Sequence, residues 1–257
     1  QINTIESSRP RVYYLLKTSH KSMKRFVFLP LLTAILMPTF ATAQDAALLA
    51  AEKARGIMTG NTGVGWTVNV TSADRKAKFQ SSSQGGKIFA EILEPADAAG
   101  RRYIAEADGK MWFWKPGLNS AVSVSKRQRL SGDAAIGDIA STSFVDGYKV
   151  EGSESGEVDG EPATVYTMKA TGFGDTYKQI KYWVTKAGNL GKKAEFYTKS
   201  GKLVRTSTME YDNKVNGAPF LSRMIVKDGN RTVDLKFSNV KLQNFPKKLF
   251  DKNELRP

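Results

Sequence analysis

Beyond residue 60, the sequence is a succession of short stretches in which apolar and polar residues alternate. The clearest of them are 66–70, 88–92, 180–184 and 233–237. A period of two is typical of strands with one buried face. Because the intervening segments are short and parallel strands need long crossover connections, the pattern predicts an antiparallel meander of about ten or eleven strands.

Turn signals separate several of these stretches. Asp-Gly favours two-residue hairpin turns, and this dipeptide occurs at 108–109, 159–160 and 228–229. The stretch 146–160 is the richest in Gly and Glu, and we interpret it as a mobile hairpin. No internal linker is evident, so the sequence predicts one domain after the N-terminal region.

Only two helices are expected. The first spans 45–59, with Asp45 as its N-cap and Gly60-Asn61 at its end, and the second is a short segment near 133–141. Two helices cannot fill the concave side of so large a sheet, whose apolar face must be buried. The sheet therefore closes as a barrel or curls into a half-barrel with the helices as a lid. Either form leaves an apolar interior suited to a hydrophobic ligand.

The N-terminal region is expected to lie outside the domain. Residues 23–43 combine a basic start, an apolar run and a small-residue Ala-Thr-Ala end, which is typical of a secretory signal peptide. An uncleaved N-terminal anchor is the alternative. Residues 1–22 precede Met23 and are interpreted as an upstream extension that is not part of the native protein. The expected domain is 44–257.

The composition of the expected mature chain excludes several kinds of chemistry. His20 is the only histidine and the sequence has no cysteine. The mature chain therefore lacks an imidazole base, a catalytic thiol and the ligands of ordinary zinc sites, and no cofactor or metal is expected. The formal net charge of +14 falls to +9 without residues 1–43. In an exported protein that charge favours a membrane surface or an acidic protein rather than nucleic acid, although a solvated basic exterior explains most of it.

The stretch 109–144 holds the most distinctive pattern in the chain. An aromatic strand, Met111-Trp112-Phe113-Trp114, precedes a one-sided strand, a basic cluster and a short amphipathic segment with two glycines. These are the parts of a covered apolar hollow with a basic rim and a flap. Each part also has an ordinary alternative. The aromatic strand could be core packing, the basic cluster a solvated strand end, and the flap an irregular loop.

The candidate site residues follow from this pattern and from the alternating stretches. The hollow is expected to be lined by Trp66, Val68, Ile88, Ile92, Met111, Trp112, Phe113, Trp114, Val122 and Val124. The lid is expected to hold Ile136, Ile139 and Phe144, and the rim or partner surface Lys126, Arg127 and Arg129. Arg101-Arg102 extends that rim only weakly.

Two segments carry a resemblance to a known family. MWFWKPGLNSAVSVSKRQRLSGDAAIGDIASTSF, at 111–144, resembles the central signature of the outer membrane lipoprotein-sorting protein family, within the superfamily of the lipoprotein carriers LolA and LolB. The closing FSNVKLQNFPKKLFDKNEL is similar to the family's last strand and its final Pro-x-x-Leu-Phe segment, here Pro246, Leu249 and Phe250. Many relatives carry more Arg where this chain has residues 117–120.

The resemblance implies a mainly β fold and a carrier function. It implies a single curved antiparallel sheet that forms an incomplete, half β-barrel, covered by an N-terminal helix and a short lid helix. It further implies a periplasmic, non-enzymatic protein that shields lipid or lipoprotein acyl chains and serves sorting alongside an inner-membrane exporter of the RND type. A monomer with peripheral membrane contact is expected.

Two other functions remain open at this stage. The first is a docking module of an RND-type export complex, with a hollow filled by its own side chains and no bound ligand. The second is a hydrolase that uses a carboxylate pair such as Asp133 with Asp138 or Glu151 with Glu154. Neither pair lies among residues that would perturb a pKa, so acids exposed at the surface are the default interpretation.

Overall fold

A computed structural model describes residues 41–58, 60–106, 110–124, 143–172 and 177–256, with the side chains of 41–45 excepted. All of these residues belong to one compact unit, Thr39–Pro257. The expected signal peptide and upstream extension fall almost wholly outside the described residues. No helix of the described part is both long and apolar enough to cross a membrane.

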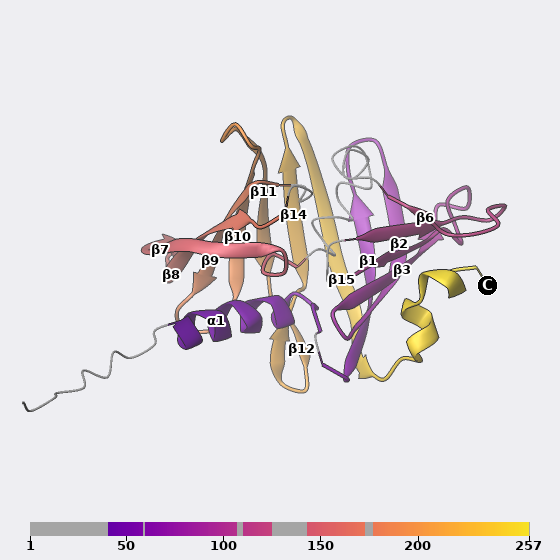
Figure 1. Ribbon diagram of the computed structural model, residues 1–257, viewed down its shortest axis with the longest axis horizontal. Coiled ribbons are helices and arrows are strands. Elements are labelled where there is room, and N and C mark those ends of the chain that lie inside the picture. Colours follow the sequence, from indigo (N-terminus) through magenta and orange to yellow (C-terminus); the bar gives the residue numbers. More distant parts are fainter. Residues whose placement is uncertain (1–40, 59, 107–109, 125–142, 173–176, 257) are drawn as a thin grey trace, which may run out of the picture. The chain divides into compact units, whose positions relative to one another are not determined.

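Most of the described chain forms one antiparallel sheet of 13 strands, in the order β6-β5-β4-β3-β2-β1-β15-β14-β11-β10-β9-β8-β7 (Figure 1). These strands are β1 (Gly63–Thr71), β2 (Lys76–Gln84), β3 (Lys87–Glu94), β4 (Arg102–Ala105), β5 (Met111–Trp114), β6 (Val122–Ser123), β7 (Tyr148–Val158), β8 (Glu161–Ala170), β9 (Gln179–Thr185), β10 (Gly191–Tyr197), β11 (Leu203–Glu210), β14 (Arg223–Asp228) and β15 (Arg231–Gln243). A separate small hairpin consists of β12 (Asn213–Val215) and β13 (Ala218–Phe220). The sheet is curved and its edge strands β6 and β7 do not pair, so the prediction of an unclosed antiparallel sheet is confirmed.

The hairpin turns lie at residues that tolerate a positive φ. Asp159 and Gly160, between β7 and β8, have φ values of 52° and 78°, as the mirror-image type I′ turn requires. Gly229 has a φ of 58° in the turn between β14 and β15, where Asp228 pairs with Arg231. Two of the three Asp-Gly predictions are thus confirmed, and the third, at 108–109, lies outside the described residues.

The stretch 146–160 differs from its interpretation as a mobile hairpin. Most of it is the 11-residue strand β7, which pairs with β8 along its length from Tyr148 to Val158. β7 lies at the edge of the sheet and most of its residues are exposed. An edge strand without a buried face shows no hydrophobic alternation in the sequence. β7 can therefore be recognised only from its pairing with β8.

The N-terminal helix forms, with different ends from those expected. Helix α1 (Ala41–Ala54) begins before Asp45, which therefore lies inside it rather than at its N-cap. It ends before Gly56, whose φ of 98° is incompatible with a continuing helix. A Cβ at Gly56 would lie 3.1 Å from the ring of Phe220 and 3.2 Å from that of Trp66. Close packing therefore ends the helix earlier than the Gly60-Asn61 signal predicts.

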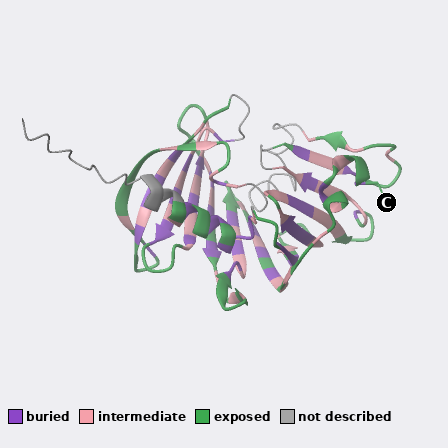
Figure 2. Cartoon of the chain, turned by 60° about the horizontal axis from the view of Figure 1, so that its bottom comes forward, coloured by how far each residue is buried: buried purple, intermediate pink, exposed green. Residues whose placement is uncertain are grey.

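Two hydrophobic clusters lie on opposite faces of the sheet. The larger one packs Leu48 and Ala51 of α1 against side chains of β1, β8–β11, β14 and β15. The smaller one consists of Phe89, Ile104, Trp114, Phe250 and Leu255. It is covered by the 3₁₀ helices η1 (Lys247–Phe250) and η2 (Lys252–Glu254), which lie beside β3 near the C-terminus in Figure 1. Figure 2 shows α1, with its outward face exposed, lying across strands that are buried beneath it.

Helix α1 covers only part of the concave face. It packs mainly against β9, β10 and β13 and shares the larger cluster with side chains of β1, whereas no described residue of β3–β5 belongs to that cluster. The expected lid helix near 133–141 lies outside the described residues. The candidate site lies on the part of the concave face that none of the described helices covers.

Candidate ligand-binding hollow

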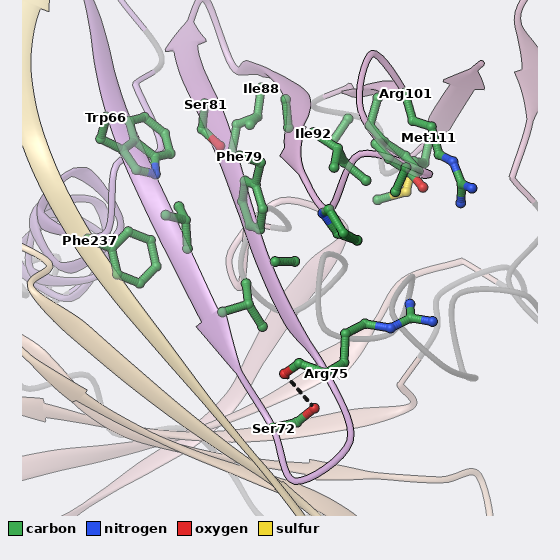
Figure 3. Close-up of a pocket in the computed structure, with 18 of the residues that line it drawn as sticks. Trp66, Ser72, Arg75, Phe79, Ser81, Ile88, Ile92, Arg101, Met111 and Phe237 are labelled. Carbon is green, nitrogen blue, oxygen red and sulfur yellow. Dashed lines mark hydrogen bonds between the residues drawn. The ribbon is translucent and has the colours of Figure 1, made fainter. Parts of the chain in front are cut away.

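A hollow of about 220 Å³ lies on the concave face of β1–β5 and β15 (Figure 3). The strands contribute Trp66, Val68, Val70, Ala77, Phe79, Ser81, Ile88, Ala90, Ile92, Tyr103, Ala105, Met111 and Phe237. The connections between strands contribute Ser72, Arg75, Pro95, Asp97, Ala98 and Arg101, and Arg231 begins β15. The floor is therefore almost entirely apolar, and the charged groups lie at one end of it.

The floor follows from the two-residue period and the register of the strands. Val68 of β1 pairs with Phe79 of β2 and with Phe237 of β15, and Phe79 pairs with Ile92 of β3. Paired residues in an antiparallel sheet point to the same face. Apolar residues on neighbouring strands therefore form one continuous surface, as the labelled side chains in Figure 3 show.

The hollow exists because several positions on that surface carry small side chains among large ones. Ala90 pairs with Ser81 on one side and with Tyr103 on the other. Ala77 and Ala105 also line the space. Large side chains around small ones leave a volume that the sheet's own residues do not fill.

Five of the ten residues predicted to line the hollow do so: Trp66, Val68, Ile88, Ile92 and Met111. Four of them belong to strands whose alternation is clear in the sequence, and Met111 belongs to the aromatic strand β5. A role for them in binding a ligand remains a prediction. Phe79, Tyr103 and Phe237 line the same surface but were not predicted, although each occupies an apolar position opposite a predicted one.

The aromatic strand β5 is divided between the two faces. Trp112 and Trp114 point away from the hollow, where the indole N–H of Trp112 donates to Glu106 at 3.2 Å and that of Trp114 donates to the Leu118 carbonyl at 2.9 Å. Trp112 also lies 3.9 Å beneath the Lys252 ammonium. Phe113 is half-buried and its ring lies 4.9 Å from that of Tyr103. The two tryptophans therefore belong to the core under the C-terminal 3₁₀ helices and not to the lining.

The remaining predicted residues lie elsewhere or outside the described residues. Val122 is exposed and Val124 half-buried at the short edge strand β6, and neither lines the hollow. Ile136, Ile139, Lys126, Arg127 and Arg129 lie outside the described residues. Phe144 is 1% exposed and is packed in the larger core.

Phe144 is fixed to helix α1 by a buried polar cluster. Its backbone N–H donates to Glu52 Oε2 at 2.7 Å, and its ring lies 3.5 Å from Arg55 Cζ. Arg55 in turn donates to both carboxylate oxygens of Glu52, at 3.0 Å each. The expected lid residue is thus a buried anchor at the point where the described chain resumes after 125–142.

Three arginines lie at one end of the hollow. Arg75 comes from the β1–β2 connection, Arg101 from the β3–β4 connection, and Arg231 from the start of β15. Only Arg101 was considered in the sequence, and only as a weak extension of the rim. Arg75 and Arg231 could have been found from their positions beside turns. An antiparallel order of strands brings such turns to the same end of neighbouring strands.

The chemistry of the hollow is that of a binding site. Among the described residues, no three His, Cys, Asp or Glu side chains are grouped so that they could hold a metal ion. Burial raises the pKa of the Tyr103 phenol, which keeps it neutral at physiological pH. Apolar side chains with a cationic end can hold an amphiphile by excluding water from its hydrocarbon part.

Comparisons with known proteins agree with this architecture. A family model described only as "Uncharacterized protein" matches residues 85–257, and the chain belongs to that family. The crystal structure of a LolA superfamily protein from Nitrosomonas europaea is similar at 28% identity and a TM-score of 0.65, covering 80% of this chain and 97% of that one. The chain is therefore similar to the LolA superfamily in fold and, at 28% identity, in sequence.

A further structure shares the LolA-like fold at lower identity. It is a putative outer membrane lipoprotein-sorting protein domain from Vibrio parahaemolyticus, with 19% identity, a TM-score of 0.67 and coverage of 82% of this chain and 98% of that one. The comparison with curated proteins finds no match. The resemblance predicted from residues 111–144 and from the C-terminal segment is confirmed at the level of the superfamily.

Proposed function

We propose that this LolA-like protein is a periplasmic carrier that shields an acyl chain of a lipid or lipoprotein in the hollow over β1–β5. The observation that carries the proposal is the apolar floor, in which small residues such as Ala90 leave an unfilled space beside Trp66, Phe79 and Ile92. Transfer of a methylene group from water to such a surface contributes about 0.8 kcal/mol. Binding needs no catalytic residue and no cofactor.

The cellular setting is part of the same proposal. The sequence of residues 23–43 favours export through a cleavable signal peptide, and the similar structure from Vibrio parahaemolyticus is described as an outer membrane lipoprotein-sorting domain. We infer transport of acyl chains between membranes, by a monomer, alongside an inner-membrane exporter of the RND type.

The decisive experiment is native mass spectrometry of the mature protein purified from its own periplasm, with organic extraction of any bound molecule. A stoichiometric lipid or acyl peptide is the expected result and would identify the cargo class. A ligand-free mass, together with no uptake of added phospholipid or acyl peptide, would overturn the proposal. That outcome would favour the alternative, a docking module without a ligand.

Filling the hollow from within should weaken uptake without unfolding the sheet. In Ala90→Phe, the new ring occupies the space between Ser81 and Tyr103. Displacing two or more methylenes of the ligand should weaken binding at least about tenfold, at about 0.8 kcal/mol each. The measurement is the dissociation constant for a fluorescent fatty-acid analogue.

The matched control is Leu93→Phe, three residues along the same strand. Leu93 is 43% exposed and does not line the hollow, so the same aromatic addition should leave uptake unchanged. Equal binding by Ala90→Phe and the wild-type protein, with both folded, would place the acyl chain elsewhere.

A further inference from the structure

The connections at one end of the hollow come from distant parts of the sequence. β1 ends at Thr71 and β2 begins at Lys76, β3 ends at Glu94 and β4 begins at Arg102, and β15 begins at Arg231. Thr71 pairs with both Lys76 and Asp234, and Lys78 pairs with Glu94. The β1–β2 turn, the β3–β4 connection and the start of β15 therefore lie at the same end of the sheet.

Each of these three segments places one arginine in the lining: Arg75, Arg101 and Arg231. Figure 3 shows the guanidinium groups of Arg75 and Arg101 beyond the apolar side chains of the floor. Guanidinium groups present several N–H donors in a planar fork that matches phosphate and carboxylate oxygens. The end of the hollow is thus chemically distinct from its floor.

Among the described residues that line the hollow, the three arginines outnumber the one carboxylate, Asp97. Asp97 lines the hollow, and the Arg101 side chain donates to the backbone carbonyl of Asp97 at 2.9 Å. Asp74 lies 3.9 Å from Arg231 and its side chain is 72% exposed. The lining itself therefore carries an excess of positive charge beside an apolar surface, which favours an amphiphile whose head group is an anion.

We propose that the ligand of the hollow is an anionic amphiphile, with its acyl chain on the floor of β1–β5 and its phosphate or carboxylate head group at Arg75, Arg101 and Arg231. This inference rests on the proposed carrier function and specifies its substrate class. It distinguishes this chain's ligand from neutral acyl compounds of the same length. Because the head group lies near the exposed end, the interaction is screened by salt.

The test compares two dodecanoyl probes below their micelle concentrations, by calorimetric titration into the delipidated mature protein. One is lysophosphatidylglycerol, which is anionic, and the other is monododecanoylglycerol, which is uncharged. The anionic probe should bind about tenfold more tightly at low salt, equivalent to about 1.4 kcal/mol. The ratio should shrink as the ionic strength rises.

The variant Arg75→Gln/Arg101→Gln should remove this preference while the affinity for the uncharged probe stays the same. Lys236→Gln is the control, because Lys236 alternates with Leu235 and Phe237 on β15 and is exposed on the opposite face. It should keep the preference although it also loses a positive charge.

The outcomes separate this inference from the proposed function. Equal affinities for the two probes in the wild-type protein, or a preference that survives in Arg75→Gln/Arg101→Gln, would overturn the anionic head-group site and leave the carrier function standing. Failure of both probes to bind would overturn the carrier function itself. Inorganic phosphate should bind far more weakly than lysophosphatidylglycerol. An equal affinity would show a free-phosphate site and also overturn the inference.

Discussion

Replacing Glu52 by alanine is expected to lower the free energy of unfolding by about 3–5 kcal/mol, because it removes one partner of a buried ion pair. The side chains of Arg55 and Glu52 are 0% and 3% exposed. Burial alone would lower the pKa of Arg55, but the Glu52 carboxylate together with Tyr182 and Tyr211 outweighs burial, and the pKa is raised above its ordinary value. Arg55 therefore stays charged, and Glu52→Ala leaves that charge buried without its carboxylate.

The same substitution also removes the acceptor of the Phe144 N–H, which ties residues 143–145 to α1. Chemical denaturation followed by tryptophan fluorescence would measure the loss. Lys53→Ala is the control, since Lys53 lies on the exposed side of the same helix and its removal should change stability by less than about 0.5 kcal/mol. A loss for Glu52→Ala as small as that control would contradict the assigned role of the pair.

A double variant separates the ion pair from its packing. Glu52→Met/Arg55→Met replaces both charged groups with apolar ones of similar length, and such replacements are often close to neutral. The double variant should therefore be more stable than Glu52→Ala. If the double variant were less stable than Glu52→Ala, contacts other than the ion pair would stabilise this part of the fold.

Gly191→Ala is expected to destabilise the fold by about 3 kcal/mol or more, at the upper end of the range for an overpacked core. A Cβ at Gly191 would lie 1.7 Å from Tyr182 Oη and 2.1 Å from Tyr182 Cζ. Tyr182 is fully buried, so its ring cannot move into solvent. The Gly191 carbonyl also accepts a hydrogen bond from Tyr211 at 2.7 Å, which holds the backbone in place.

Thermal unfolding followed by circular dichroism would measure this effect, with Gly188→Ala as the control. A Cβ at Gly188 would meet nothing closer than Leu190 Cγ at 3.5 Å, an ordinary van der Waals contact, so the control should unfold near the wild-type temperature. In a double-mutant cycle, Gly191→Ala and Tyr182→Ala should be less than additive, because the clash with the new Cβ exists only while the Tyr182 ring is present. Additive losses would contradict the steric explanation.

Both sites bear on how the carrier would work. The Glu52 cluster fixes the chain where it resumes after 125–142, the region in which the sequence places the lid. Gly191 and Tyr182 belong to the half of the concave face that α1 covers and that is densely packed. The part of the sheet under α1 is therefore a packed core, whereas β1–β5 present the hollow.

The sequence determined the class of fold because its signals are local. Alternation within 66–70, 88–92, 180–184 and 233–237 required strands, and Asp-Gly dipeptides required hairpins. Four lining residues, Trp66, Val68, Ile88 and Ile92, could be predicted because their apolar positions alternate with others along the strand. The edge strand β7 escaped prediction, since neither of its faces is buried enough to leave a pattern in the sequence.

The tertiary structure decided which face of an apolar strand meets the hollow. Met111 to Trp114 is apolar on both faces, so no period distinguishes them. Pairing with β4 and the 3₁₀ helices over the other face place Trp112 and Trp114 in the core and Met111 in the lining. Arg75, Arg101 and Arg231 likewise come together only through strand order, because residues up to 156 positions apart share one end of a sheet only after the ladder forms.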